Sequence, residues 1–243
     1  MQGLLLHKGM YSGDALHDFL ASALADQGVR TWGDLKLVDP GSAIPPERSY
    51  RLVVIVSDVS RGRMLRLPWD YEEALGVDAD SQSVAEAVCA SAASPFFFRP
   101  RSFPARPSVA GRSSVLGADG GLLSNFPVDV FDRKDALPAR WPTFGVMLSA
   151  RHPAAAEWRP NATTFQYAKS LISTMLNAHD RRHIDDPSVT ERTVFVDTSG
   201  HSSTDFALST EDKIDLIDSG RKAGEKFLAH WDWNRWKERF GSV

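Results

Sequence analysis

The residues whose types and spacing best suit chemistry lie in the stretch VLGADGGLLSNFPVDV, residues 115–130. Asp119 supplies a carboxylate, which can accept a proton as a general base. Gly120 and Gly121 follow it, and two glycines permit a tight turn and leave room for another group to approach the acid. Asp-Gly-Gly is also a common turn sequence, so the surrounding residues must decide between a catalytic and a structural interpretation.

Two histidines form a second candidate site. His179 and His183 stand four residues apart in a predicted helix, with Asp180 beside the first. Histidines at this spacing can share a metal ion, but the zinc-protease pattern needs a glutamate where this chain has Asp180. A solvated helix end is the alternative, since histidine near a helix C-terminus interacts favourably with the helix dipole. We therefore predict no metal site and no cofactor.

The last stretch, residues 225–243, is rich in tryptophan and is predicted to form a helix appended to a single domain. Trp233, Trp236 and Phe240 share one face of this helix. Aromatic residues interleaved with lysine and arginine suit a membrane interface. They suit packing of a terminal helix onto its domain equally well, so both interpretations stay open.

Length and composition limit the class of protein. A chain of 243 residues fits one α/β domain, or one domain with an appendage. Hydrophobic residues make up 42% and charged residues 24%, which is ordinary globular usage, so a sizeable core can form. The net charge of −3 argues against electrostatic capture of nucleic acid. Cys89 is the only cysteine, which excludes an internal disulfide and a thiolate metal cluster.

The sequence MQGLLLHKGMYSG at the N-terminus has three consecutive leucines before His7 and Lys8. A signal peptide needs a longer apolar stretch and a cleavage site of small residues. No run approaches the ~18 apolar residues that span a bilayer. We therefore expect a cytoplasmic protein, with peripheral contact with a membrane left open.

Hydrophobic periodicity predicts alternating helices and apolar strands, and hence a layered α/β domain with a mostly parallel sheet. The strongest strand is RLVVIV, residues 51–56, a continuous apolar run typical of a strand covered on both faces. Ser83 and Glu86 have the spacing of a capping box at a helix start. Strands are expected at 35–38, 51–56, 64–67, 144–149 and 193–197, and an irregular loop with short extended pieces at 94–117. Helices are expected at 12–27, 83–93, 162–183 and 209–240, the last with a weak point at Gly220 or Gly224.

Two ordered stretches resemble the patatin-like phospholipase family. VAEAVCASAASPFFFRP, residues 84–100, is similar to the small-residue helix of that family, which ends in Ser-x-x-x-Pro-x-x-Phe. ADGGLLSNFPVDVF, residues 118–131, is similar to the loop that follows, which carries Asp-Gly-Gly and then Asn-x-Pro. Weaker similarity extends over residues 8–224. The residues that fit the family's motif are Ser91, Pro95, Phe98, Asp119, Gly120, Gly121, Asn125 and Pro127.

The resemblance implies a layered helix–sheet–helix domain, truncated at its N-terminal side, that hydrolyses lipid acyl esters with a Ser–Asp dyad. Asp119 falls on the dyad aspartate and would act as general base towards the serine. Clustered phenylalanines are more often simply core, but here they could line an acyl pocket. The implied site consists of Asp119 as catalytic residue, Gly120, Gly121 and Asn125 as its supporting loop, and Phe96, Phe97 and Phe98 as the acyl pocket.

The nucleophilic serine of the family lies in a G-x-S-x-G turn, and no such sequence occurs in the 243 residues. The stretch from Gly200 to Thr204 contains Ser202, but it ends in threonine and matches the family's closing loop instead. The chain is then a fragment, the product of a misplaced start, or a remnant that lost catalysis. Each explanation predicts that these residues alone are inactive as a hydrolase.

We therefore predict a lipid acyl hydrolase, here the part that carries the dyad aspartate without the serine. The alternative is a non-catalytic remnant that binds lipid or a partner, which predicts exposed apolar surface and self-association. Hydrolysis by a metal ion on His179 and His183 is a third hypothesis. The expected partners are a lipid or ester substrate and a membrane surface, and not nucleic acid.

Overall fold

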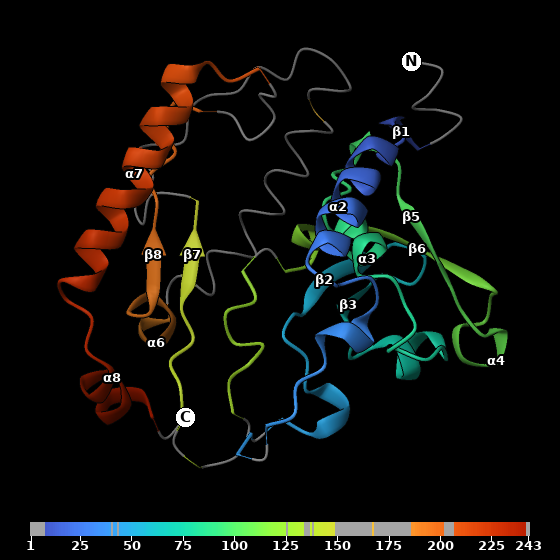
Figure 1. Cartoon of the computed structure of the whole chain (residues 1–243), viewed down its shortest axis with the longest axis horizontal. Helices are drawn as coiled ribbons and strands as arrows, with labels where there is room; N and C mark the ends of the chain where they lie inside the picture. Colours follow the sequence, from blue (N-terminus) through green and yellow to red (C-terminus); the bar gives the residue numbers. More distant parts are fainter. Residues whose placement is uncertain are drawn as a thin grey trace. The chain divides into compact units, whose positions relative to one another are not determined.

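The computed structural model describes residues 8–39, 41–42, 44–124, 126–133, 137, 139–148, 167, 186–201 and 207–241. The chain divides into two compact units, an N-terminal unit, Met1–Asn125, and a C-terminal unit, Phe126–Val243. Figure 1 shows that each unit combines strands with helices. This is the mixed α/β character that the sequence predicts.

The main sheet of the N-terminal unit has the strand order β3 (Arg63–Leu67), β2 (Val54–Asp58), β6 (Ser114–Asp119) and β5 (Arg101–Pro104). Every neighbouring pair in this sheet is antiparallel, so the predicted mostly parallel pairing is wrong here. Short connections explain the β2–β3 and β5–β6 pairs, because a parallel crossover needs about a dozen residues or more. β2 and β3 are joined by residues 59–62, and β5 and β6 by residues 105–113, which include α4 (Pro107–Ala110).

Strand β2 is buried along its whole length, as the apolar run in the sequence predicts. The core around it contains Leu65 and Leu67 from β3, neither of which is exposed. Trp32 and Tyr71 join the same core from outside the sheet. Burial of a large apolar side chain stabilises a fold by about 1.5–3 kcal/mol. These side chains therefore fix β2, and with it the neighbouring strand β6.

Residues 35–38 are not the predicted strand. Trp32–Leu35 forms the 3-10 helix η1, and Lys36 makes an isolated bridge to Tyr50. Asp34 explains the helical turn, because its carboxylate accepts the backbone N–H groups of Arg30 at 2.8 Å and Thr31 at 2.9 Å. The other short helices of this unit are η2 (Pro46–Arg48), the π-helix η3 (Tyr71–Leu75) and the 3-10 helix η4 (Gly120–Leu122).

The longer helices of this unit, α2 (Asp14–Asp26) and α3 (Val84–Ser91), pack against each other, and α3 also packs on β2 and β6. Ser83 begins α3 as predicted, because its hydroxyl accepts the N–H of Glu86 at 3.3 Å. The Glu86 carboxylate does not complete the predicted capping box. It accepts hydrogen bonds from Arg101 of β5 at 2.6 and 2.9 Å instead, and His17 of α2 lies 3.3 Å from it.

The chain between residues 94 and 117 is more regular than the predicted loop. Strand β4 (Phe96–Phe98) pairs in parallel with β1 (Gly9–Tyr11), and β5, α4 and the first part of β6 follow. Glycine is needed at the start of β1, because a Cβ atom on Gly9 would lie 2.5 Å from the carbonyl carbon of Phe98. The close pairing of β1 with β4 therefore depends on this residue.

The sheet of the C-terminal unit is a parallel pair, β7 (Gly145–Met147) and β8 (Thr193–Phe195). Both strands lie within the predicted ranges but are shorter, at three residues each. Met147 and Val189, the latter in helix α6 (Pro187–Thr190), share a small core with Phe126 and Val128.

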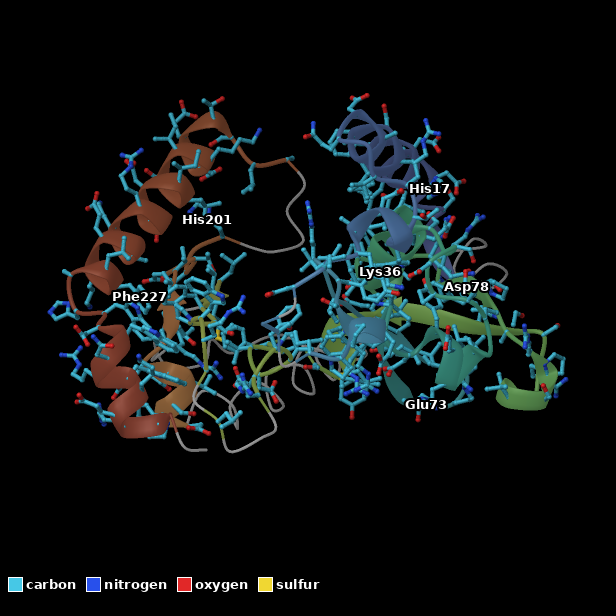
Figure 2. The ribbon with its side chains drawn as sticks, turned by 60° about the horizontal axis from the view of Figure 1, so that its bottom comes forward. His17, Lys36, Glu73, Asp78, His201 and Phe227 are labelled. Carbon is cyan, nitrogen blue, oxygen red and sulfur yellow. The ribbon has the colours of Figure 1, made fainter. Side chains whose placement is uncertain are left out.

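The predicted final helix is two helices, α7 (Thr210–Leu228) and α8 (Trp233–Phe240). The chain breaks at residues 229–232 and not at Gly220 or Gly224, both of which lie inside α7. Asp232 is the reason, because its carboxylate accepts the N–H of Arg235 at 2.7 Å and so begins a new helix. Figure 2 shows Phe227 at the end of α7 that leads into α8.

The predicted helix over 162–183 lies outside the described residues, except for Tyr167. His179 and His183 lie outside them as well, so the metal hypothesis stays a prediction. Among the helices that the structure describes, none has both the length and the apolar character needed to cross a membrane.

Candidate active site

Asp119 is the last residue of β6, where the sheet ends and the chain turns into η4. Its partner across the sheet is Val56 of the buried strand β2. Its backbone N–H donates to the carbonyl oxygen of Ala93 at 3.1 Å. The residue is thus fixed from two sides, by the sheet and by the segment that follows α3, and it is half-buried.

The two glycines after Asp119 have different structural roles. A Cβ atom on Gly120 would lie 2.1 Å from the carbonyl oxygen of Ile55, so only glycine fits against β2 at this point. Gly121 donates its backbone N–H to Asp119 Oδ1 at 2.9 Å. The first glycine therefore lets the turn lie close to the sheet, and the second orients the carboxylate. Asn125, the third predicted member of the loop, lies outside the described residues.

Ser94 is a neighbour of the carboxylate that the sequence pattern did not single out. Its hydroxyl acts on the Asp119 carboxyl and lowers the pKa of that acid. Its carbonyl oxygen accepts the backbone N–H groups of Phe97 at 3.2 Å and Phe98 at 3.0 Å. The one signal in the sequence was its place directly before Pro95, inside the stretch that carries the family resemblance.

Burial dominates the electrostatics of the site. It raises the pKa of the Asp119 carboxyl above its ordinary value, because the charged form loses solvent. The hydrogen bonds from the Gly121 N–H and the Ser94 hydroxyl favour the charged form and lower the pKa by less. A carboxylate with a raised pKa is a stronger base, so this environment suits proton abstraction better than a fully solvated aspartate would.

The predicted acyl-pocket residues form β4, and all three are half-buried. Phe96 adopts a left-handed backbone conformation, with φ at 70°. The Phe98 ring lies 6.2 Å from the ring of Tyr11 in β1. Ser94 holds the start of this run, because its carbonyl oxygen accepts the N–H groups of Phe97 and Phe98, and it also influences the pKa of Asp119. The role of Phe96, Phe97 and Phe98 in holding an acyl chain stays a prediction.

Among the residues that the structure describes, neither a reactive cysteine nor a metal-binding cluster adds to this site. Cys89 is buried in α3, and burial raises the pKa of its thiol, which disfavours a reactive thiolate. Ser202 lies outside the described residues. Within the part of the chain that the structure describes, His, Cys, Asp and Glu side chains form no group of three that could hold a metal ion.

The fold and the site together define an α/β protein with a half-buried carboxylate at a strand end, held by a glycine turn. Comparison with known proteins gives the family. The patatin-like phospholipase model matches residues 1–132, which include β6, Asp119 and both glycines. The chain belongs to the patatin-like phospholipase family. At family level, this membership supports lipid acyl hydrolase activity.

Two relatives extend the comparison. The first is a protein of Bacillus subtilis (strain 168) named "Uncharacterized protein YqhO", which is 32% identical over 223 residues, 92% of this chain and 68% of the relative. The second is the "RpoH suppressor" of Rhizobium meliloti (strain 1021), 30% identical over 150 residues, 49% of this chain and 23% of the relative. The similarity to the first relative covers 92% of this chain and therefore extends into the C-terminal unit.

Proposed function

We propose that this protein hydrolyses the acyl esters of lipids, with Asp119 as the general base of a Ser–Asp dyad. The observation that carries the proposal is the environment of this carboxylate. It ends strand β6 beside the buried strand β2, its pKa is raised by burial, and the Gly121 N–H donates a hydrogen bond to it. A plain Asp-Gly turn on the surface would need none of these features.

The chemistry follows from the position of the acid. The serine oxygen attacks the acyl carbonyl carbon, and the serine proton passes to the Asp119 carboxylate. Collapse of the tetrahedral intermediate expels the alcohol, which takes that proton. Water, deprotonated by the same carboxylate, then attacks the acyl-serine and releases the fatty acid. Backbone N–H groups that stabilise the oxyanion would have to compensate for the large pKa gap between serine and aspartate.

The 243 residues contain no serine in a G-x-S-x-G turn. The proposal therefore assigns the nucleophile to residues outside this sequence, and it predicts that the 243 residues alone do not hydrolyse esters. The substrate class that fits the family is a lipid or a simple carboxylic ester.

Labelling with a fluorophosphonate probe tests this proposal, because the probe reacts with activated serines. It is applied to the purified 243-residue chain and to the protein isolated from its own cells with an antibody against this chain. Peptide mass spectrometry then locates the label. We expect no labelled serine in the purified chain and one labelled serine, outside these residues, in the isolated protein.

Two other outcomes would change the account. A labelled serine within the 243 residues would contradict the assignment of the nucleophile to another segment. No labelled serine in either sample would contradict the hydrolase and favour the alternative, a non-catalytic lipid-binding or interaction module.

A further inference from the structure

Helix α7 carries a stripe of exposed apolar side chains. Ile214, Ile217 and Leu228 are 54%, 62% and 69% exposed. Ile217 follows Ile214 by one turn, and Leu228 lies three turns beyond Ile217, so the three share one side of the helix. Among the described residues, they belong to neither core cluster. An exposed apolar stripe of this kind is typical of an interaction site.

Another side of α7 packs on the C-terminal unit. The Ser219 hydroxyl donates to the carbonyl oxygen of Asp197, two residues after β8, at 2.6 Å. The Phe227 ring lies 5.6 Å from the ring of Phe144. Figure 1 shows α7 beside β8, with β7 on the far side of β8. These contacts hold α7 in its unit without the apolar stripe.

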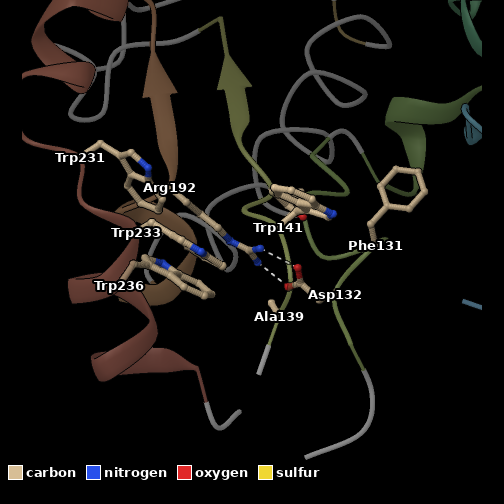
Figure 3. A pocket seen from close by; sticks show the side chains of 9 residues that line it. Phe131, Asp132, Ala139, Trp141, Arg192, Trp231, Trp233 and Trp236 are labelled. Carbon is tan, nitrogen blue, oxygen red and sulfur yellow. Dashed lines mark hydrogen bonds and ion pairs between the residues drawn. The ribbon is translucent and has the colours of Figure 1, made fainter. Parts of the chain in front are cut away.

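The aromatic rings of α8, by contrast, have partners within the chain. Trp233 and Trp236 stack with a centroid distance of 5.5 Å and an angle of 16°. Figure 3 shows Arg192 extending past these two rings to Asp132, with which it forms an ion pair. The α7 stripe is therefore the better candidate for contact with another molecule.

The charges of α7 differ between its two halves. Residues 210–218 contain four acidic side chains and one lysine, a net charge of −3. Residues 219–228 contain three basic side chains and one glutamate, a net charge of +2. Two antiparallel copies of this helix attract each other, because the acidic half of each lies beside the basic half of the other, whereas parallel copies would bring like charges together. The charge pattern therefore favours a second, antiparallel copy of α7 as the partner.

The shape of the stripe fits the same arrangement. Gly224 lies on the side of Ile217, and a Cβ atom on this glycine would meet nothing within 4 Å. When Ile217 of one copy is placed opposite Gly224 of an antiparallel second copy, Ile214 comes within one residue of Leu228 of that copy. The bulky side chains of one half thus meet a glycine and a leucine of the other half. Such self-complementary contact characterises a two-fold interface.

The axis of this pair passes between residues 220 and 221, so the two copies of Arg221 lie close to each other. The guanidinium of Arg221 is 3.0 Å from the carboxylate of Asp218 in its own helix. In the antiparallel pair, Asp218 of the second copy also lies within about one turn of this arginine. Two arginines and two aspartates therefore meet at the axis, and their charges cancel.

We propose that two copies of this chain form a dimer with two-fold symmetry, in which the apolar stripes of antiparallel α7 helices pack against each other. The exposed side chains of Ile214, Ile217 and Leu228 supply the apolar contact, and the unequal charges of the two halves set the orientation. The proposal does not depend on the hydrolase function, because it concerns a surface of the C-terminal unit away from Asp119 in the sequence.

Disulfide cross-linking of the purified 243-residue chain tests the partner and the orientation together. Each variant carries Cys89→Ala, which removes the only native cysteine. Ile214→Cys and Leu228→Cys are oxidised separately and as a mixture. In the antiparallel pair, positions 214 and 228 of different copies are neighbours, whereas the two copies of position 214 are about 20 Å apart along the axis, too far for a disulfide. We expect a covalent dimer from the mixture and not from either variant alone.

Sedimentation velocity measures the affinity. We expect a dimer whose fraction rises with concentration, and Ile217→Lys should raise its dissociation constant about ten-fold or more, because it places a charge in the apolar contact. Val146→Lys is the matched control, since Val146 lies in β7 of the same unit and is 63% exposed. It should leave the dissociation constant unchanged. Circular dichroism checks that both variants keep their helix content.

Three results would overturn the proposal. The unmodified chain could remain monomeric at its highest soluble concentration. Ile214→Cys alone could cross-link as readily as the mixture, which would show a parallel or unordered pair. Val146→Lys could weaken the dimer as much as Ile217→Lys, which would place the contact on another surface.

Discussion

The two units of the chain are stabilised in different ways. Sixteen buried side chains form the core cluster of the N-terminal unit, around an antiparallel sheet of four strands. Among the residues of the C-terminal unit that the structure describes, the corresponding cluster has four, around a parallel pair of short strands. The described helices α7 and α8 contain no buried residue. The N-terminal unit thus depends on burial, while the C-terminal unit depends on specific polar and aromatic contacts.

The two units also differ in the contacts that fix their side chains in position. In the N-terminal unit the core sets the position of β2 and β6, and the candidate carboxylate stands at the end of β6. In the C-terminal unit the rings of Phe144, Phe227 and Trp231 pack at centroid distances of 5.1 to 5.6 Å. Elsewhere in this unit, the buried guanidinium of Arg192 makes a directed contact with Asp132. Substitutions should therefore have different consequences in the two units.

The largest effect is expected for Gly120→Ala. The new methyl group would lie 2.1 Å from the carbonyl oxygen of Ile55, which is backbone and cannot move aside cheaply. We expect a loss of about 3 kcal/mol or more in the free energy of unfolding. Urea unfolding followed by circular dichroism measures it.

Gly220→Ala is the matched control in the other unit. Its Cβ atom would meet nothing within 4 Å, and the residue lies inside α7. The same change should therefore stabilise α7 by about 0.5–1 kcal/mol. A similar loss in both variants would contradict the contrast between a tight contact at the sheet and open space on the helix.

Asp132→Ala is expected to have the next largest effect. It leaves the charge of Arg192 buried without its partner, and removal of one member of a buried pair is costly. Because Asp132 is one-third exposed, we expect about 2–3 kcal/mol, below the cost for a fully buried pair. Hydrogen exchange of the β8 amides reports the loss locally.

The exposed pair of Asp218 and Arg221, 3.0 Å apart on α7, provides the comparison. Asp218→Ala should change stability by about 0.5 kcal/mol or less, because solvent screens this pair. If the two aspartate variants lose equal stability, the buried ion pair is not an important contact of this unit.

Ser209→Ala should destabilise α7 by about 1 kcal/mol. The Ser209 hydroxyl accepts the N–H of Asp212 at 3.1 Å, and the Asp212 carboxylate accepts the N–H of Ser209 at 3.0 Å. Faster hydrogen exchange in the first turn of α7 would reveal the loss of this cap. Ser209→Asp keeps an acceptor and should retain most of the protection, so equal exchange in both variants would argue against a capping role.

Asp119→Asn should stabilise the protein by about 0.5–1 kcal/mol at pH 7, although it removes the proposed base. The folded-state pKa of Asp119 is raised, so ionisation costs stability as pH rises through that pKa. Below the unfolded pKa the carboxyl is protonated in both states, and the cost is absent. The gain should therefore disappear near pH 3. Thermal unfolding of both proteins at the two pH values measures it, and a loss at pH 7 would contradict the raised pKa.

The local features of the fold could be read from the sequence. The apolar run at β2, the serine that begins α3 and the serine that begins α7 are signals carried by a few neighbouring residues. The antiparallel order of the main sheet could not be read in this way, because it depends on which distant strands pair. The break between α7 and α8 was predicted at the wrong place. Glycine is a poor helix former, so Gly220 or Gly224 was expected to be the break, whereas the chain breaks just before Asp232, which caps the start of α8.

The candidate site likewise has features that could be predicted from the sequence and features that could not. Asp119, Gly120 and Gly121 are adjacent in sequence, so their turn could be predicted together. The contact of Ser94 with Asp119 brings together residues 25 positions apart, and the clash that fixes Gly120 involves Ile55 on another strand. Such contacts follow from the packing of α3 and β2 against β6. They become visible only in the folded chain.

The central claim is that Asp119 is the base of an acyl hydrolase. The most direct test is hydrolysis of a p-nitrophenyl acyl ester by the protein isolated from its own cells, with Asp119 native or replaced by asparagine in the gene. Gly220→Ala serves as the control for a neutral substitution. The account predicts that Asp119→Asn lowers the rate by about 10²- to 10⁴-fold while the control keeps full activity. An unchanged rate in Asp119→Asn would contradict the role of this carboxylate.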